Sequence, residues 1–183
     1  MADLIPIADT DQNAVEALLD TVFGTDRQQR TAYRLREAVG IIPPLSFAAV
    51  EGDLLVGSIQ CWPVELAADS GDRVPMILVG PIAVSPLRQD VGIGRALTRR
   101  VIEVAQNSAI AGGDSLMLIG DPDYYGRFFG FGADRTGQWR LPGPFEPHRL
   151  LALGNGIPMQ AGHVGPRIGA TVESRLAGHA SGS

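Results

Sequence analysis

The stretch of sequence best suited to chemistry is residues 84–97, where two spaced glycines open an expected helix. It reads Val-Ser-Pro-Leu-Arg-Gln-Asp-Val-Gly-Ile-Gly-Arg-Ala-Leu, with the glycines at positions 92 and 94. The first turn of a helix leaves backbone N–H groups without partners, and the helix dipole adds about half a positive charge there. Glycine also lets a phosphate approach the backbone closely. The segment therefore predicts an anion site made of consecutive N–H groups, which suits a pyrophosphate.

Two other interpretations of the glycine pair are open at this point. A dinucleotide-binding fingerprint needs a third small residue, but Leu97 occupies that position. That fingerprint also normally follows the first strand of its fold, not a strand ending at residue 84. An isolated Gly-x-Gly is equally compatible with a purely structural loop before a helix. The wider sequence context has to separate these alternatives.

Composition excludes several other kinds of site. All 15 basic residues of the 183-residue chain are arginines, so a lysine Schiff base, a lysine general base and a phosphate-binding P-loop lysine are excluded. The single cysteine, Cys61, excludes an internal disulfide, and the three histidines show no metal-ligand spacing. The net charge of −5 argues against a nucleic-acid partner. We therefore expect no metal and no nucleic acid.

Length and hydropathy favour one soluble domain. A chain of 183 residues is within the usual range of roughly 100–200 residues for one domain. No apolar run approaches the ~20 residues of a membrane-spanning helix. The first ten residues include Asp3 and Asp9 and no basic residue, unlike a secretory signal. We expect a cytoplasmic protein without a membrane partner.

The elements that must position residues 84–97 follow the order β-α-α-β-β-β-α-β-α-β-β. Alternating or continuous apolar runs predict strands, and apolar residues at helical spacing predict helices. The expected strands are residues 4–7, 45–50, 54–66, 74–84, 115–119, 133–141 and 150–153. The first expected helix begins after one of the possible caps Asp9, Thr10 and Asp11 and ends at Phe23. The others are a polar helix over 27–39, residues 93–108 and a short helix over 122–130, with Asp121-Pro122 as its start and an end near Gly130. Pro63 predicts a bulge or a sheet edge, and Gly80-Pro81 predicts a bulge or a local splay.

The context of the glycine pair resembles the acetyl-coenzyme A motif of the GNAT superfamily of N-acetyltransferases, V-x-P-x-x-[RQ]-x-x-G-x-[GA]. The matching residues are Val84, Pro86, Gln89, Gly92 and Gly94. Downstream, the strand at 115–119, the helix that carries two tyrosines and the Gly-Phe pair at 130–131 are similar to the same family. The resemblance covers roughly residues 3–153. The runs 120–128 and 141–145 look like one bacterial subgroup of predicted GNAT enzymes.

This resemblance implies an α+β, three-layer GNAT-like fold. Its sheet is mixed, mostly antiparallel and twisted, with a splayed central strand pair and flanking helices. We expect residues 1–153 to form a single acetyltransferase domain. Residues 154–183, which are rich in glycine and proline, are expected to form a C-terminal arm or a partly disordered tail.

The function that the resemblance implies is direct transfer of an acetyl group from acetyl-coenzyme A to a primary amine. The acceptor is a small molecule or a peptide that the sequence does not identify, and the protein is expected to be a monomer or homodimer. The alternative is a non-catalytic module that binds or senses acyl-coenzyme A.

The resemblance also implies roles for individual residues. Tyr125 is the expected proton donor to the departing thiolate, with Tyr124 as second choice, and the Val84 N–H is expected to polarise the thioester carbonyl. The pantetheine arm is expected to lie along Ile82, Ala83 and Val84. The pyrophosphate is expected on the N–H groups of Gln89, Asp90, Val91, Gly92, Ile93, Gly94 and Arg95. The sequence departs from the family pattern at Asp90, where glycine is frequent, and Tyr125 lies five rather than four residues before Gly130.

No general base is identified. Glu65 and Asp123 are the nearest carboxylates, and a solvated surface role is the alternative for each. Cys61 is interpreted as a small buried residue and not as a nucleophile. The neighbouring Trp62 is expected either to line the acceptor pocket or to fill the core. The arginines of the polar helix, Arg27, Arg30, Arg34 and Arg36, are interpreted as a solvated face, with attraction of an anionic acceptor as the alternative.

Overall fold

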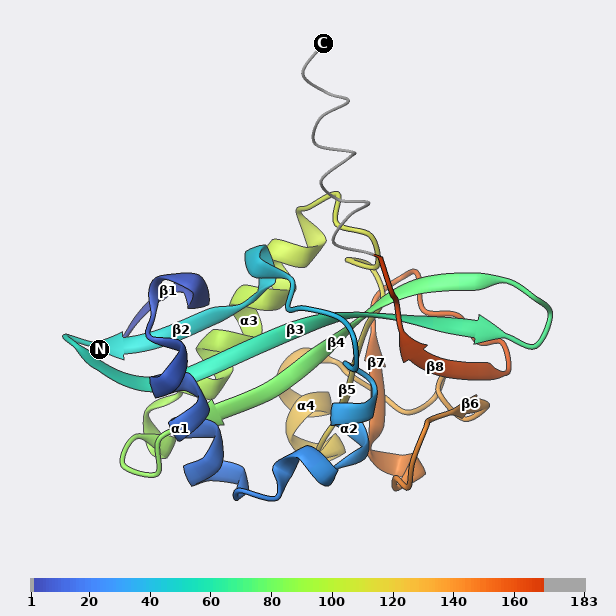
Figure 1. Cartoon of the computed structure of the whole chain (residues 1–183). Coiled ribbons are helices and arrows are strands. Elements are labelled where there is room, and N and C mark those ends of the chain that lie inside the picture. Colours follow the sequence, from blue (N-terminus) through green and yellow to red (C-terminus); the bar gives the residue numbers. More distant parts are fainter. Residues whose placement is uncertain (1, 170–183) are drawn as a thin grey trace, which may run out of the picture. The chain divides into compact units, whose positions relative to one another are not determined.

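The computed structural model describes residues 2–169, with the side chain of Asp90 outside the description (Figure 1). The strands are β1 (Asp3–Pro6), β2 (Phe47–Glu51), β3 (Leu54–Ala68), β4 (Arg73–Val84), β5 (Leu116–Ile119), β6 (Trp139–Arg140), β7 (Leu150–Leu153) and β8 (Gly162–Pro166). The helices are α1 (Gln12–Phe23), α2 (Thr31–Arg34), α3 (Ile93–Gln106) and α4 (Pro122–Phe129).

The strands form one sheet of eight with the order β1-β2-β3-β4-β5-β7, while β8 pairs with both β3 and β6. The pairs β1–β2, β2–β3, β3–β8 and β5–β7 are antiparallel, and β4–β5 and β6–β8 are parallel. The expected α+β fold with a mixed, mostly antiparallel sheet is therefore confirmed.

Two compact units make up the chain, and each is described by itself. The first contains residues up to Arg30 together with 41–61 and 79–108, and the second contains 31–40, 62–78 and the residues from 109 on. Strands β3 and β4 contribute residues to both units. None of the described helices is both long and apolar enough to cross a membrane.

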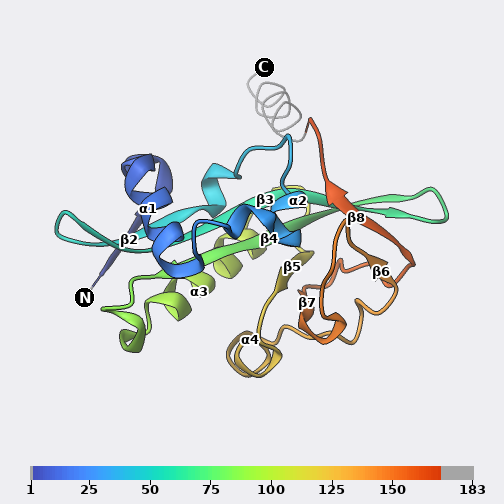
Figure 2. The ribbon, with the colours of Figure 1, turned by 60° about the horizontal axis from the view of Figure 1, so that its bottom comes forward.

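In the first unit, helices lie on both faces of the sheet. Figure 2 shows α1 above and α3 below the strands of this unit. Helix α1 begins at Asp11, whose carboxylate accepts a hydrogen bond from the Asn13 N–H (3.0 Å). Its apolar face is buried in a cluster of Ile7, Val15, Leu18, Leu19, Ala48 and Ala83. Helix α3 buries Ile93, Leu97, Thr98, Val101 and Ala105.

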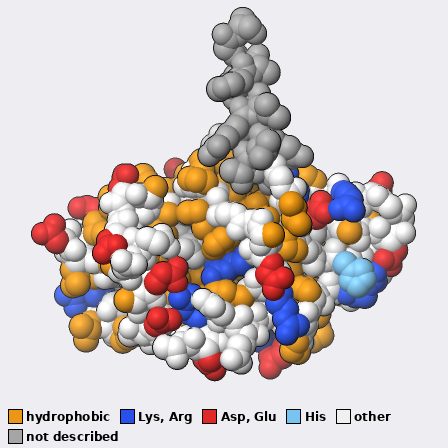
Figure 3. All heavy atoms as spheres, in the orientation of Figure 1, with side chains coloured by type: hydrophobic (Ala, Val, Ile, Leu, Met, Phe, Trp, Pro, Cys, Tyr) orange, Lys and Arg blue, Asp and Glu red, His pale blue; other side chains and the backbone are white. Residues whose placement is uncertain are grey.

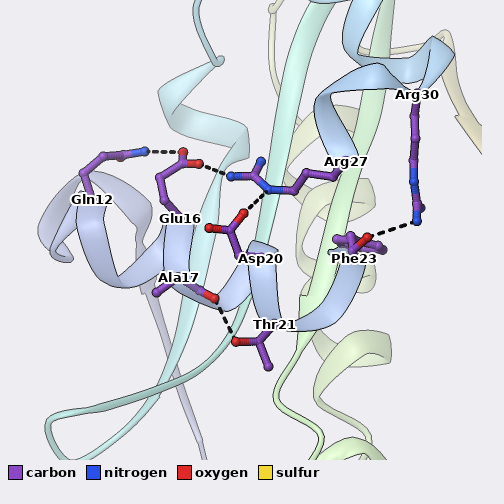
Figure 4. A network of polar contacts seen from close by, with 8 residues as sticks. All are labelled: Gln12, Glu16, Ala17, Asp20, Thr21, Phe23, Arg27 and Arg30. Atoms are coloured by element: carbon purple, nitrogen blue, oxygen red, sulfur yellow. Dashed lines mark hydrogen bonds and ion pairs between the residues drawn. The ribbon is translucent and has the colours of Figure 1, made fainter. Parts of the chain in front are cut away.

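The polar segment 27–39 differs from its prediction. It contains a 3₁₀ turn over Arg27–Gln29 and one turn of helix, α2, instead of a single long solvated helix. Arg27 is only 4% exposed, and α1 supplies both of its anionic partners (Figure 4). Its Nε donates to Asp20 Oδ1 at 3.0 Å, and its Nη2 donates to Glu16 Oε2. A guanidinium this deeply buried needs paired charges, so Arg27 is part of the packing between this turn and α1.

We predict that Arg27→Ala lowers the free energy of unfolding by about 1–3 kcal/mol, because it leaves two carboxylates of α1 without their cation. Figure 3 shows acidic and basic side chains interspersed over this face of the molecule. Urea unfolding followed by circular dichroism measures the change. The matched control is Arg30→Ala, because Arg30 is exposed and donates only to the Phe23 carbonyl (3.2 Å). Equal losses in the two variants would contradict the prediction.

In the second unit, the core cluster is formed by Leu35, which directly follows α2, by residues of β3, β4 and β5, and by residues of the C-terminal strands and the loop before β8. Its members are Leu35, Val64, Leu66, Met76, Leu78, Met117, Trp139, Leu150, Ala152, Ile157 and Val164. Helix α2 is held against the 141–145 loop by two side-chain donors. Thr31 Oγ1 donates to the Pro144 carbonyl, and Arg34 Nη1 donates to the Pro142 carbonyl (2.8 Å).

Two expectations about the C-terminal third need correction. The strand predicted over 133–141 is only Trp139–Arg140, because the Trp139 N–H closes a turn on the Thr136 carbonyl (3.0 Å) and Pro142 follows directly. Part of the expected arm, Gly162–Pro166, is strand β8. It pairs with β3 from Val64 to Ala68, whereas β2 pairs with β3 only up to Ile59. Pro63 lies between these two ladders, where its missing N–H breaks no strand pairing. Residues 170–183 lie outside the described residues, and the division into a domain and an arm stays a prediction.

Candidate functional site

The loop between β4 and α3 has the form that the glycine pair predicts. After Val84 the chain turns, with the Arg88 N–H donating to the Ser85 carbonyl at 2.8 Å. A 3₁₀ turn over Gln89–Val91 follows, and Gly92 takes the left-handed conformation, with φ 79° and ψ 18°. Helix α3 begins immediately after it at Ile93. Glycine is the residue that adopts this backbone conformation at least cost, so Gly92 fixes where the helix starts.

The start of α3 offers backbone donors to an anion. The first hydrogen bond of the helix joins the Ala96 N–H to the Gly92 carbonyl (3.0 Å), so the N–H groups of Ile93 and Gly94 precede the helical ladder. Both N–H groups lie in the first turn of the helix. The Arg95 guanidinium folds back over Gly92, with Nη2 3.6 Å from where a Cβ on Gly92 would be. The dipole of α3, the N–H donors of its first turn and the Arg95 cation together suit a phosphate group.

Strand β4 leads into this loop with its side chains divided between two faces. Ala83 is fully buried in the cluster beneath α1, so only its backbone is available to a ligand. Ile82 and Val84 alternate with it and are half-buried on the opposite face. The Gly80–Pro81 peptide bond is cis, and β4 pairs with β5 at Ile77 and Leu78, just before it. The expected splay beyond that point, like the roles of Ile82, Ala83 and Val84, stays a prediction.

Sequence reasoning missed Gly57, which lies in β3 against the start of α3. A Cβ at this position would be 2.8 Å from Ile93 Cγ2 and 3.2 Å from both Leu97 Cδ1 and the Ala83 carbonyl oxygen. Only glycine lets α3 approach the strand this closely. An isolated glycine inside an apolar strand is a known signal for such an approach, and it was available in the sequence.

Helix α4, in the second unit, carries the predicted tyrosine. Asp121 caps the helix by accepting from the Asp123 N–H (3.0 Å), Pro122 occupies its first turn, and Gly130 ends it. The Tyr125 ring lies on the backbone of Gly120, where a Cβ would be 2.5 Å from Cε2. Its ring centroid is also 6.2 Å from that of Phe131 in an edge-on contact. Tyr125 is therefore fixed by the end of β5 and by the Gly-Phe pair.

The surroundings of Tyr125 keep its hydroxyl protonated. Burial raises the pKa of Tyr125 to about 12, with smaller contributions in the same direction from Tyr124 and Asp121 and an opposing one from Arg149. A phenol with this pKa retains its proton throughout the neutral range. Tyr124 lies in an aromatic group, with ring centroids 4.9 Å from Tyr125, 5.2 Å from Phe128 and 6.1 Å from Phe129.

The two candidate general bases, Glu65 and Asp123, have different surroundings. Glu65 is engaged by Arg73, whose Nη1 lies 2.5 Å from Glu65 Oε1. Asp123 is exposed in the first turn of α4. Neither carboxylate is thereby assigned a catalytic role. The described residues contain no group of three or more His, Cys, Asp and Glu side chains suited to a metal ion.

Cys61 and Trp62 are adjacent in β3 but differ in setting. Cys61 is fully buried, as expected of a small buried residue, and burial raises the pKa of its thiol. Trp62 packs partly buried against the core cluster of the second unit, and its face is covered by the Arg36 guanidinium, 4.4 Å from the ring centroid. Arg36 also stacks on Tyr33 at 3.6 Å, so it is not a freely solvated side chain.

The model of the acetyltransferase (GNAT) domain family matches residues 3–132, and the chain belongs to this family. No curated protein matches the chain in sequence.

Solved structures support the same fold. The GNAT-family N-acetyltransferase YhbS from Escherichia coli, in complex with CoA, is 20% identical over 93% of this chain and 92% of that chain, with a TM-score of 0.68. A GNAT-family acetyltransferase from Brucella melitensis, in complex with acetyl-CoA, is 24% identical over 90% and 95%, with a TM-score of 0.57. Naa50 from Arabidopsis thaliana, in complex with the bisubstrate analogue CoA-Ac-MVNAL, is 19% identical over 84% and 97%, with a TM-score of 0.52.

Proposed function

We propose that this protein is an N-acetyltransferase that moves an acetyl group from acetyl-coenzyme A directly to a primary amine of a small molecule or peptide. The observation that carries the proposal is the start of α3, where the left-handed Gly92 places the N–H groups of Ile93 and Gly94 in the first turn, ahead of the Ala96–Gly92 hydrogen bond and beside the Arg95 guanidinium. The relatives with CoA, acetyl-CoA or a CoA-peptide analogue bound support the same choice of substrate. A cytoplasmic location and a monomeric or homodimeric state belong to this proposal.

The proposed roles divide between binding and chemistry. The backbone of residues 89–95 holds the pyrophosphate, and the backbone of Ile82–Val84 holds the pantetheine arm. The amine nitrogen attacks the thioester carbonyl carbon, whose oxygen accepts a hydrogen bond from the Val84 N–H. As the C–S bond breaks, the electron pair goes to sulfur, and Tyr125 donates its proton to the thiolate. The proton released by the amine goes to solvent, because no base is assigned.

A second candidate function is a module that binds acyl-coenzyme A without turnover. It is favoured by one observation, the engagement of Glu65 by Arg73, which leaves the amine without an assigned base. Tyr125 on α4, packed against Gly120 and with its hydroxyl protonated, favours catalysis instead.

The test combines calorimetry with a turnover assay. Isothermal titration measures binding of acetyl-coenzyme A, and thiol release is followed with a panel containing an amino acid, a polyamine, an aminoglycoside and a peptide with a free N-terminus. Binding with thiol release in the presence of one amine supports the transferase. Binding without release from any amine favours the non-catalytic module. Absence of binding contradicts both.

A further inference from the structure

We infer that the β2–β3 hairpin positions the coenzyme A loop, and that Glu51 is the positioning residue that does so through Arg88. The inference rests on the proposed function, since it concerns how the loop of residues 85–92 is held ready for coenzyme A. All the contacts that carry it lie within the first unit.

Glu51 and Arg88 join the hairpin to the middle of the loop. Arg88 Nε lies 3.0 Å from Glu51 Oε2 and 3.3 Å from Oε1, so both carboxylate oxygens are engaged. The same guanidinium donates from Nη1 to the Leu87 carbonyl at 3.0 Å. Glu51 therefore fixes the Arg88 side chain, and that side chain fixes the loop backbone.

The same hairpin also anchors both ends of the loop. The register of β2 and β3 shifts after Ala49, which leaves Val56 as a bulge, and the Val56 carbonyl accepts from the Ser85 N–H at 2.8 Å. At the other end, Ile93 packs on Gly57. The Glu51–Arg88 pair is the anchor between these two, and the three contacts come from residues 51–57.

The loop itself has little apolar packing to hold it. Leu87 is 82% exposed and Val91 is 65% exposed. A segment with few buried apolar contacts opens at low free-energy cost, so its conformation depends on its polar anchors. Removing one anchor should therefore disorder the loop rather than unfold the protein.

Positioning of the loop and simple charge repulsion predict opposite changes in coenzyme A affinity when Glu51 is removed. A carboxylate near an anion site repels the ligand, so removal of its charge alone would tighten coenzyme A binding. If Glu51 positions the loop, its removal weakens coenzyme A binding, because part of the binding free energy must then be used to order the loop. An ion pair this exposed, with 41% of the Arg88 side chain and 27% of the Glu51 side chain accessible, contributes little to global stability.

The experiment measures acetyl-coenzyme A affinity by calorimetry for Glu51→Ala, Arg88→Ala and the double variant, with melting temperatures as a check on folding. We expect each single variant to bind about three- to tenfold more weakly, a factor that corresponds to about 0.6–1.4 kcal/mol of lost loop order. The double variant should be no weaker than the weaker single one, since both remove the same anchor. KM for acetyl-coenzyme A should rise by the same factor, with kcat within about twofold of wild type.

A matched control is Arg73→Ala. Arg73 forms the comparable ion pair with Glu65 across β3 and β4, remote in sequence from the loop, and its loss should leave the affinity unchanged. The isosteric change Glu51→Gln removes the charge and one acceptor oxygen while keeping the size of the side chain. It should also bind acetyl-coenzyme A more weakly than wild type, whereas charge repulsion alone predicts tighter binding.

Tighter or unchanged binding in folded Glu51→Ala overturns the inference, as do additive losses in the double variant. Should Glu51→Ala not fold, the isosteric Glu51→Gln decides the question, because tighter or unchanged binding there also overturns the inference. Absence of binding by the wild-type protein would instead contradict the proposed function, so the two failures are distinguishable.

Discussion

Replacing Gly92 with valine is expected to weaken acetyl-coenzyme A binding at least ~100-fold. Gly92 has φ 79° and ψ 18°, a conformation that a β-branched residue adopts only with strain, and it immediately precedes the donors of α3. The start of the helix must then shift, and the new side chain points toward the Arg95 guanidinium. Each charge-assisted hydrogen bond is worth roughly 1.5–3 kcal/mol, so loss of two accounts for about 3 kcal/mol, or ~100-fold in affinity.

Calorimetry on the folded variant measures this loss, and Gly71→Val separates it from general backbone strain. Gly71 has φ 101° in the turn between β3 and β4, and a Cβ there meets nothing within 4 Å. Gly71→Val therefore introduces comparable backbone strain outside the coenzyme A loop, and the acetyl-coenzyme A affinity of this variant should match wild type. If folded Gly92→Val bound acetyl-coenzyme A normally, the pyrophosphate site would have to be moved elsewhere.

Local patterns predicted most of the fold because they depend on neighbours in sequence. Helix α1 follows from its apolar spacing and from the cap candidates at residues 9–11, of which the structure uses Asp11, and α4 follows from Asp121-Pro122 and Gly130. The long arms of β3 and β4 follow from their apolar runs. In each case, the residues that decide the element lie within it or immediately beside it.

The errors occurred where distant residues decide the structure. Arg27 has the sequence context of an exposed helix, but its partners Glu16 and Asp20 are on another helix. Strand β8 has too many glycines to predict a strand, yet a Cβ on Gly162 would be 2.5 Å from the Ala67 carbonyl oxygen. That residue must be glycine because β3 lies so close, and nothing local in the sequence indicates the partner.

The features of the candidate site also divide into those that a local motif predicts and those that depend on distant residues. The helix start at Gly92 and the placement of Tyr125 on α4 were predictable, because each is encoded in a short motif. The contacts that hold the loop were not, since Glu51 and Arg88 lie 37 residues apart in sequence. A single sequence contains the two residues but no indication that they meet.

Replacing Tyr125 with phenylalanine is expected to lower kcat by ~10²–10⁴, the usual contribution of a positioned proton donor. The Tyr125 ring packs on Gly120 and Phe131, contacts that phenylalanine retains, so folding and cofactor affinity should change little. KM for acetyl-coenzyme A should therefore stay close to wild type while kcat falls. Steady-state thiol release at saturating acetyl-coenzyme A measures the effect.

The pH dependence of kcat provides a further check on the role of Tyr125. Burial raises the pKa of Tyr125 from 10.0 to about 12, so the donor form persists as pH rises and is lost only as pH approaches the raised value. Ionisation of Tyr125 should consequently cause no fall in wild-type kcat between about pH 7 and pH 10. Tyr124→Phe is the matched control, because it removes the neighbouring hydroxyl from the same helix and should leave kcat nearly unchanged. Normal turnover in Tyr125→Phe together with a large loss in Tyr124→Phe would transfer the role of proton donor to Tyr124.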